Sequence, residues 1–188
     1  MARIVDRTFL GEVLRDIADE FGEAGRLYLT GSAALIFEGL RSASVDIDYA
    51  PEIAPPLLSR FEESVRTVSR KRDVILEVVT IGGWIVLPPG WEGRCRYLAT
   101  YGALDVYAFD PYSLCLSKLL RGRAPDLQDV AALARAGHVD LDRLADMARW
   151  LAAQWSPMGW HGGAGDRETL RAKLDGHFAE LQHLAADA

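Results

Sequence analysis

The chain has 188 residues, of which 49% are hydrophobic and 26% are charged. This length and this apolar fraction suffice for one buried core, so a disordered protein and a large multidomain protein are both excluded. Its 21 lysines and arginines against 27 aspartates and glutamates give a formal net charge of −6. This charge argues against a protein that binds nucleic acid by covering its phosphates with positive charge, although a local basic site is compatible with it.

The cysteines and the N-terminal residues indicate the compartment. Cys95 and Cys115 lie in apolar stretches without His or Cys at metal-ligand spacing, so a zinc site and a disulfide framework have no support and a reducing cytoplasm is the natural interpretation. Acidic residues stand at positions 6, 12 and 16, where a signal peptide is apolar, and no run approaches the roughly 18 apolar residues of a membrane span. We therefore expect a cytoplasmic protein without a membrane partner.

Hydrophobic periodicity predicts alternating helices and strands over the first 110 residues. Apolar residues at spacings of three and four indicate helices, and short β-branched or alternating runs indicate strands. The predicted helices are 7–21, 33–40 and from 55 to 69–72, and the predicted strands are 27–30, 45–49, 74–79, 95–100 and 104–109. Pro51 is expected to close the strand over 45–49.

The rest of the chain predicts helices alone. Asp110 followed by Pro111 is typical of a helix start, with the aspartate as N-cap. The predicted helices begin at 111, 126, after Asp140 and at 166, and residues 156–165 are expected to form a linker or mobile loop. The predicted fold class is α/β (α+β): a small mixed, twisted sheet flanked by helices over residues 1–110, with a C-terminal helical segment over 111–188 packed on it.

One stretch carries recognisable chemistry: Gly31-Ser32, then thirteen residues, then Asp46-Ile47-Asp48. A glycine and a small hydroxyl residue at the turn into a helix let backbone N–H groups approach a phosphate, whose charge the helix N-terminus favours. Aspartates two residues apart on a strand project from the same face, and together they can bind a divalent cation through oxygen ligands. This pattern predicts a site for a nucleoside triphosphate and a metal ion.

Simpler interpretations exist for the same residues. Asp46 and Asp48 could form a polar face at the edge of a sheet, Gly31 could relieve a tight turn, and Ser32 could be only an N-cap. However, two carboxylates on the same face repel each other unless a cation or a donor lies between them. This repulsion favours the functional interpretation.

The order of these residues resembles the nucleotidyltransferases of the polymerase-β superfamily, whose signature is Gly-Gly or Gly-Ser, a spacer, and then Asp-x-Asp or Asp-x-Glu. A second block, residues 113–130, resembles the Lys-Leu…Arg…Asp-x-x-Asp block of the AbiEii-type, toxin-related branch. The resemblance covers about residues 27–137. It implies the nucleotidyltransferase fold and metal-dependent transfer of a nucleoside monophosphate from an NTP to an acceptor hydroxyl.

The resemblance also implies roles and partners. Asp46 and Asp48 would hold Mg²⁺ or Mn²⁺, and Gly31 and Ser32 would cradle the triphosphate of the bound NTP. The implied acceptors are a tRNA 3′ end and a protein hydroxyl, and the implied partner is the other member of a toxin–antitoxin pair.

Two residues of the second block have implied roles as well. Lys118 would neutralise charge that builds up on the triphosphate, and Asp129 would position Lys118 or act as a base. Without the resemblance, Lys118 is equally well a surface charge on a leucine-rich helix, where it would contribute little to the core.

The third metal-binding carboxylate of the superfamily has no distinctive context in this sequence. Glu77 and Asp105 each lie in a predicted strand, with Glu77 slightly favoured, and Asp129 is the alternative for this branch. The alternative function is therefore a catalytically inactive, nucleotidyltransferase-like binding or regulatory module. An aminoglycoside-modifying relative would share the same chemistry.

Overall fold

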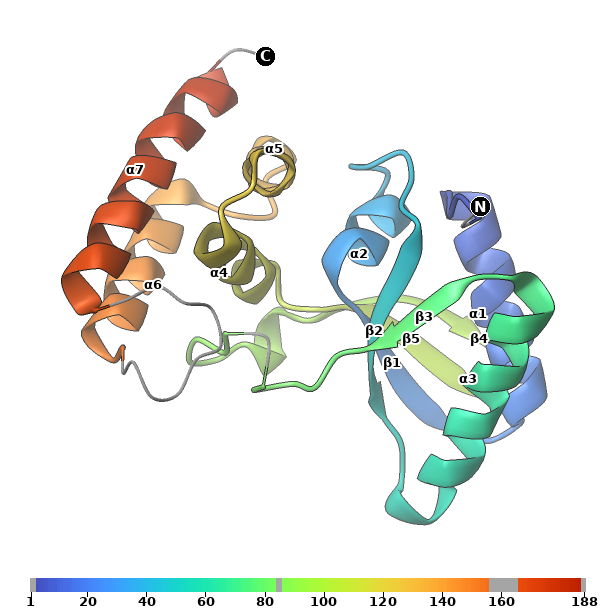
Figure 1. Cartoon of the computed structure of the whole chain (residues 1–188). Helices are drawn as coiled ribbons and strands as arrows, with labels where there is room; N and C mark the ends of the chain where they lie inside the picture. The colour runs from blue at the N-terminus through green and yellow to red at the C-terminus, as the bar shows by residue number, and fades with distance from the viewer. Residues whose placement is uncertain (1–2, 84–85, 156–165, 187–188) are drawn as a thin grey trace. The chain divides into compact units, whose positions relative to one another are not determined.

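A computed structural model describes residues 3–83, 86–155 and 166–186 (Figure 1). The chain divides into two compact units, the first made of Met1–Trp84 and Glu92–Asp110 and the second of Ile85–Trp91 and Pro111–Ala188. The predicted linker or mobile loop at 156–165 lies outside the described residues.

The first unit contains a five-stranded sheet with the order β3-β2-β1-β5-β4. The pairs β1–β5 and β2–β3 are parallel, whereas β1–β2 and β4–β5 are antiparallel, so the predicted mixed sheet is confirmed. Its elements are α1 (Arg7–Phe21), β1 (Gly25–Leu29), α2 (Gly31–Glu38), β2 (Asp46–Glu52), the 3₁₀ turn η1 (Pro55–Leu57), α3 (Leu58–Arg72), β3 (Ile75–Val78), η2 (Glu92–Arg94), β4 (Arg96–Tyr101) and β5 (Leu104–Ala108).

Helices α1 and α3 lie side by side on one face of this sheet (Figure 1). The period-2 alternation of the strands sends their apolar residues to that face, and Phe21 of α1 packs edge-on against Phe61 of α3 with ring centroids 5.2 Å apart. The buried strand residues are Leu27, Leu29, Ile47, Tyr49, Leu104, Val106 and Ala108. The half-buried Asp46 and Asp48 therefore project from the opposite face.

The prediction that Pro51 closes the second strand is wrong, because β2 continues to Glu52. Thr30 N donates to Asp48 O and Val79 N donates to Tyr49 O, so successive residues of β2 point their backbone groups alternately to β1 and to β3. By this alternation Pro51 faces the β3 side, beyond the point where β3 ends. A proline is tolerated there because no ladder hydrogen bond needs its missing N–H.

The second unit is helical, and the predicted helices are confirmed as α4 (Pro111–Arg121), α5 (Ala124–Arg135), α6 (Leu141–Ala153) and α7 (Arg167–Ala186). Asp140 caps α6 as predicted, since its carboxylate accepts a hydrogen bond of 2.8 Å from Arg143 N. Within the described ranges, no helix has both the length and the apolar character needed to cross a membrane.

A charged contact joins the two helices that cover the sheet of the first unit. Arg72 of α3 donates from Nε and Nη2 to the two carboxylate oxygens of Asp16 in α1, at 2.8 and 3.0 Å. These hydrogen bonds lower the pKa of Asp16 to about 2 against the opposing effect of burial, and Lys71 adds to the lowering. The ionised form of Asp16 is therefore the form that stabilises the fold.

We expect the free energy of unfolding to decrease as the pH falls from about 4 to about 2. The pKa of Asp16 is depressed on folding, so its contribution is present above its ordinary pKa of 3.8 and is lost as the carboxylate is protonated. Urea unfolding at several pH values should show a smaller acid-induced loss in Asp16→Asn than in the wild type. Asp19→Asn, at an exposed position of the same helix, is the control and should keep the wild-type dependence.

Candidate functional site

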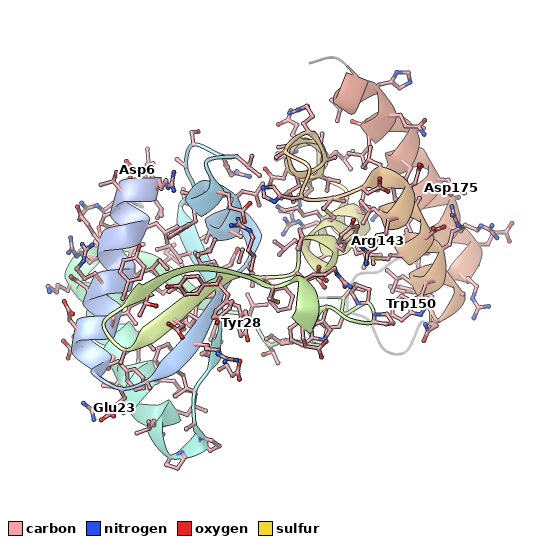
Figure 2. The ribbon with its side chains drawn as sticks, turned by 180° about the vertical axis from the view of Figure 1, so that it is seen from behind. Asp6, Glu23, Tyr28, Arg143, Trp150 and Asp175 are labelled. Atoms are coloured by element: carbon pink, nitrogen blue, oxygen red, sulfur yellow. The ribbon has the colours of Figure 1, made fainter. Side chains whose placement is uncertain are left out.

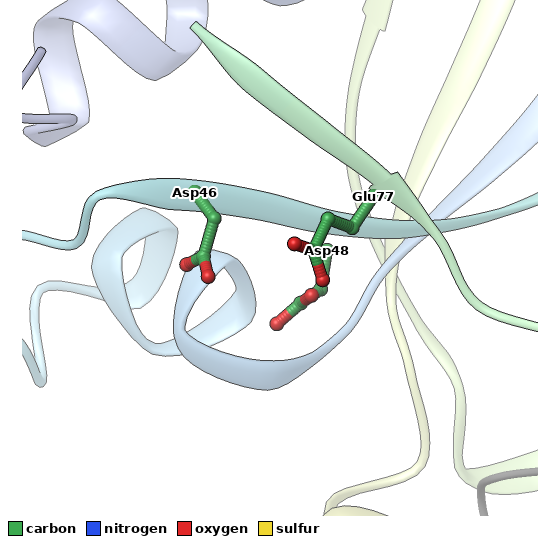
Figure 3. A group of neighbouring side chains, drawn as sticks. All are labelled: Asp46, Asp48 and Glu77. Carbon is green, nitrogen blue, oxygen red and sulfur yellow. The ribbon is translucent and has the colours of Figure 1, made fainter. Parts of the chain in front are cut away.

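Three carboxylates lie together on the strands β2 and β3. In the parallel register Glu77 is beside Asp48, and Asp46 is two residues before Asp48 on the same face. One ligand oxygen from each of Asp46, Asp48 and Glu77 lies within 4.8 Å of the other two, and the three side chains point to the same side of the strands (Figure 3). Asp46 and Asp48 are half-buried, whereas Glu77 is exposed, so the group is open to a ligand.

Among the described residues, the acidic group does not include the two other candidates for a third carboxylate. Asp105 lies on β5, where it is paired in register with Arg26 of β1. Its carboxylate accepts a hydrogen bond of 2.6 Å from Thr100. Asp129 belongs to the second unit. Among the described acidic residues, Glu77 is therefore the one that joins Asp46 and Asp48.

Gly31 is required by the Asp48 side chain. Its φ is +52°, in the left-handed region that favours glycine. A Cβ at this position would lie only 2.0 Å from Asp48 Oδ2, far inside van der Waals contact. The sequence predicts that Gly31 brings the backbone close to a phosphate, and the structure adds that this glycine makes room for a carboxylate of the acidic group.

The start of α2 lies beside the same carboxylate. Thr30 occupies the N-cap position of α2. The interpretation of Ser32 as only an N-cap is therefore wrong. In the described structure the Thr30 side chain makes no capping hydrogen bond. Ser32 is half-buried within the first turn. The first N–H groups of a helix have no partner in their own helix, and they carry partial positive charge that favours an anion.

Ser44 is a site residue that the sequence analysis missed. It lies two residues before Asp46, and its hydroxyl donates a hydrogen bond of 2.7 Å to Asp46 Oδ1. The spacing could have indicated it, because residues i and i+2 of an extended segment share a face.

Lys118 and Asp129 are brought together in the second unit. Lys118 Nζ lies 2.7 Å from Asp129 Oδ2 and 3.8 Å from Asp126 Oδ1. Lys118 is only 4% exposed, so its interpretation as a surface charge that contributes little to the core is wrong. A buried ammonium needs such carboxylate partners, because moving an unpaired charge from water into the protein interior costs on the order of several kcal/mol.

Asp126 connects this pair to the end of α4. Burial would raise the pKa of Asp126, but hydrogen bonds and charge from Arg121, with charge from Lys118, lower it overall. Its carboxylate also accepts from Arg123 N at 3.2 Å, which satisfies a backbone donor at the start of α5. Arg121, Asp126, Lys118 and Asp129 thus form one ionic group between α4 and α5.

Residues 11–156 match the family described as "Nucleotidyltransferase of unknown function (DUF6036)". The match spans most of the chain, so the protein belongs to this nucleotidyltransferase family. The match does not identify the AbiEii-type branch. No curated protein and no solved structure matches the chain.

Gly31→Ala should disrupt the acidic group. The new Cβ would displace the Asp48 carboxylate, and the left-handed backbone would add strain. We expect loss of Mn²⁺ binding, measured by calorimetry, together with a lower melting temperature.

Gly39→Ala is the matched control for this change. Gly39 ends the same helix with a φ of +78°, but its Cβ would meet nothing within 4 Å. This variant should lose stability and still bind Mn²⁺. Equal Mn²⁺ binding by Gly31→Ala and the wild type would contradict the close approach to Asp48.

Proposed function

We propose that the protein is a metal-dependent nucleotidyltransferase that moves a nucleoside monophosphate from an NTP to an acceptor hydroxyl. In this reaction the acceptor oxygen forms a bond to the α-phosphorus, the bond from that phosphorus to the β-phosphate oxygen breaks, and pyrophosphate and a proton are released. The observation that carries the proposal is the group of Asp46, Asp48 and Glu77 beside the start of α2.

The donor set of this group fits Mg²⁺ or Mn²⁺. All three side chains offer carboxylate oxygens, which are the ligands preferred by hard divalent cations. Three like charges at this separation repel, so an added cation is favourable. Asp46, Asp48 and Glu77 would hold such an ion, which would supply positive charge for the phosphates and for deprotonation of the acceptor hydroxyl.

The residues at the start of α2 would hold the triphosphate. The N–H groups of the first turn and the Ser32 hydroxyl are donors suited to phosphate oxygens. Gly31 supports this role because its missing side chain lets the Asp48 carboxylate, a proposed metal ligand, lie against the start of the helix. Binding here would orient the NTP relative to the acidic group.

Lys118 and Asp129 complete the proposal from the second unit. Lys118 would neutralise charge on the triphosphate, and the hydrogen bond of 2.7 Å from Lys118 Nζ supports a positioning role for Asp129. A general-base role for Asp129 is less favoured, because its carboxylate already accepts from the ammonium.

We also propose a class of acceptor and a class of partner. The resemblance of residues 113–130 to the AbiEii-type block supports a tRNA 3′ end or a protein hydroxyl as acceptor, and a toxin or an antitoxin as partner. Mass spectrometry of tRNA and candidate proteins, incubated with each NTP and Mg²⁺, tests the acceptor. A nucleotide-binding module without activity would bind NTP and leave every acceptor unmodified.

The three carboxylates should be essential for function and dispensable for folding. Asp46→Asn, Asp48→Asn and Glu77→Gln each remove one like charge from the metal-free protein, so its stability should stay the same or rise. In the wild type, Mg²⁺ with NTP at a hundredfold excess over Kd should stabilise the fold by about 2.7 kcal/mol. Thermal shift should show that each variant loses this stabilisation together with transfer.

Asp105→Asn is the control for these variants, since Asp105 is a carboxylate of the same sheet outside the acidic group. It should keep the stabilisation by Mg²⁺ and NTP. A variant of Asp46 or Asp48 that unfolds without metal would indicate a structural role for that carboxylate instead.

Lys118→Ala should destabilise the second unit, by about 3–5 kcal/mol, because it leaves buried carboxylates without their ammonium. The double variant Lys118→Met with Asp129→Leu removes both charges, and its stability should return close to that of the wild type. Urea unfolding measures this difference. Transfer activity should be lost in both variants, so a double variant that is stable and active would contradict the proposed role of Lys118.

A further inference from the structure

Ser44 has the geometry of a support for a metal ligand. Its hydroxyl donates to Asp46 Oδ1 at 2.7 Å, and both residues are half-buried. We infer that Ser44 is a positioning residue of the acidic group, whose hydroxyl fixes the Asp46 carboxylate in the orientation that binds a divalent cation. The inference rests on the proposed function, because it concerns the same cation.

The backbone of Ser44 is itself held in place. Val5 N donates to Ser44 O at 2.8 Å, and Ser44 N donates to Val5 O at 3.0 Å. Val5 is fully buried, and the next residue, Asp6, caps α1 by accepting from Phe9 N at 2.8 Å; Figure 2 shows Asp6 at this end of the helix. The serine hydroxyl therefore projects from an anchored position.

Asp46 needs such a support for a physical reason. The torsion that turns an aspartate carboxylate has a broad energy minimum, and the charges of Asp48 and Glu77 repel the carboxylate in the absence of a cation. A carboxylate has about four acceptor sites, so the bond from Ser44 leaves sites for a metal ion. The hydroxyl thus reduces the orientational freedom that cation binding would otherwise have to remove.

The loss of a hydrogen-bonding support for a metal ligand typically weakens metal affinity by roughly 10–100-fold. We expect Ser44→Ala to weaken Mn²⁺ binding by this factor, measured by titration with the paramagnetic resonance signal of free Mn²⁺. Ser44→Thr keeps the hydroxyl and should restore the affinity. Ser42→Ala, at an exposed position in the same loop, is the matched control and should bind Mn²⁺ like the wild type.

The same titration separates failure of the inference from failure of the proposed function. Wild-type Mn²⁺ affinity in Ser44→Ala would overturn the inference and leave the proposed function standing, whereas absence of Mn²⁺ binding by the wild-type protein would overturn both. Melting curves without metal show whether each variant is folded. If Ser44→Ala does not fold, Ser44→Cys keeps the size with a weaker donor, and wild-type affinity in that variant overturns the inference. Loss of affinity that Ser44→Thr does not restore also overturns it.

Discussion

Repulsion among three carboxylates is the constraint on which the first unit depends. Like charges within 4.8 Å of one another oppose folding unless donors or a cation offset them. The chain nevertheless maintains the group: the β2–β3 register places Glu77 beside Asp48, and Gly31 leaves room for the Asp48 side chain. Ser44 donates to Asp46. These features keep the negative charge concentrated, which is expected of a site for a cation.

The buried ionic group of the second unit likewise lowers the free energy of unfolding relative to an apolar alternative. Lys118 and Asp129 lie among buried leucine and valine side chains of α4 and α5, where an apolar pair would serve stability as well or better. The end of α4 is also tied to α7, because His177 Nδ1 and Lys173 Nζ contact the carbonyl oxygens of Leu119 and Leu120. These contacts satisfy carbonyl groups that a helix end leaves without partners. The ionic pair therefore belongs to two helices of which one, α4, is joined at its end by side-chain contacts to a third helix.

Local hydrophobic patterns predicted the helices and strands well, but they did not predict how the strands pair. Helical periodicity found α1 and α3, and alternation found β2, because these signals come from neighbouring residues. The end of β2 depends on which partner strand Pro51 faces, and the choice of Glu77 over Asp105 depends on the register. Strand order and register are set by long-range contacts, which one sequence does not display. The burial of Lys118 was likewise not predicted, because it also depends on contacts between residues that are distant in the sequence.

The measurement that tests the central claim most directly follows two labels on one nucleotide. The protein is incubated with Mg²⁺, tRNA and cellular protein, and with each NTP labelled at either the α- or the γ-phosphate. Nucleotidyl transfer predicts that the α-label becomes attached to an acceptor and that the γ-label is released as pyrophosphate, and Asp46→Asn should abolish both. Attachment of the γ-label to an acceptor, or its release as inorganic phosphate without attachment of the α-label, would contradict the account.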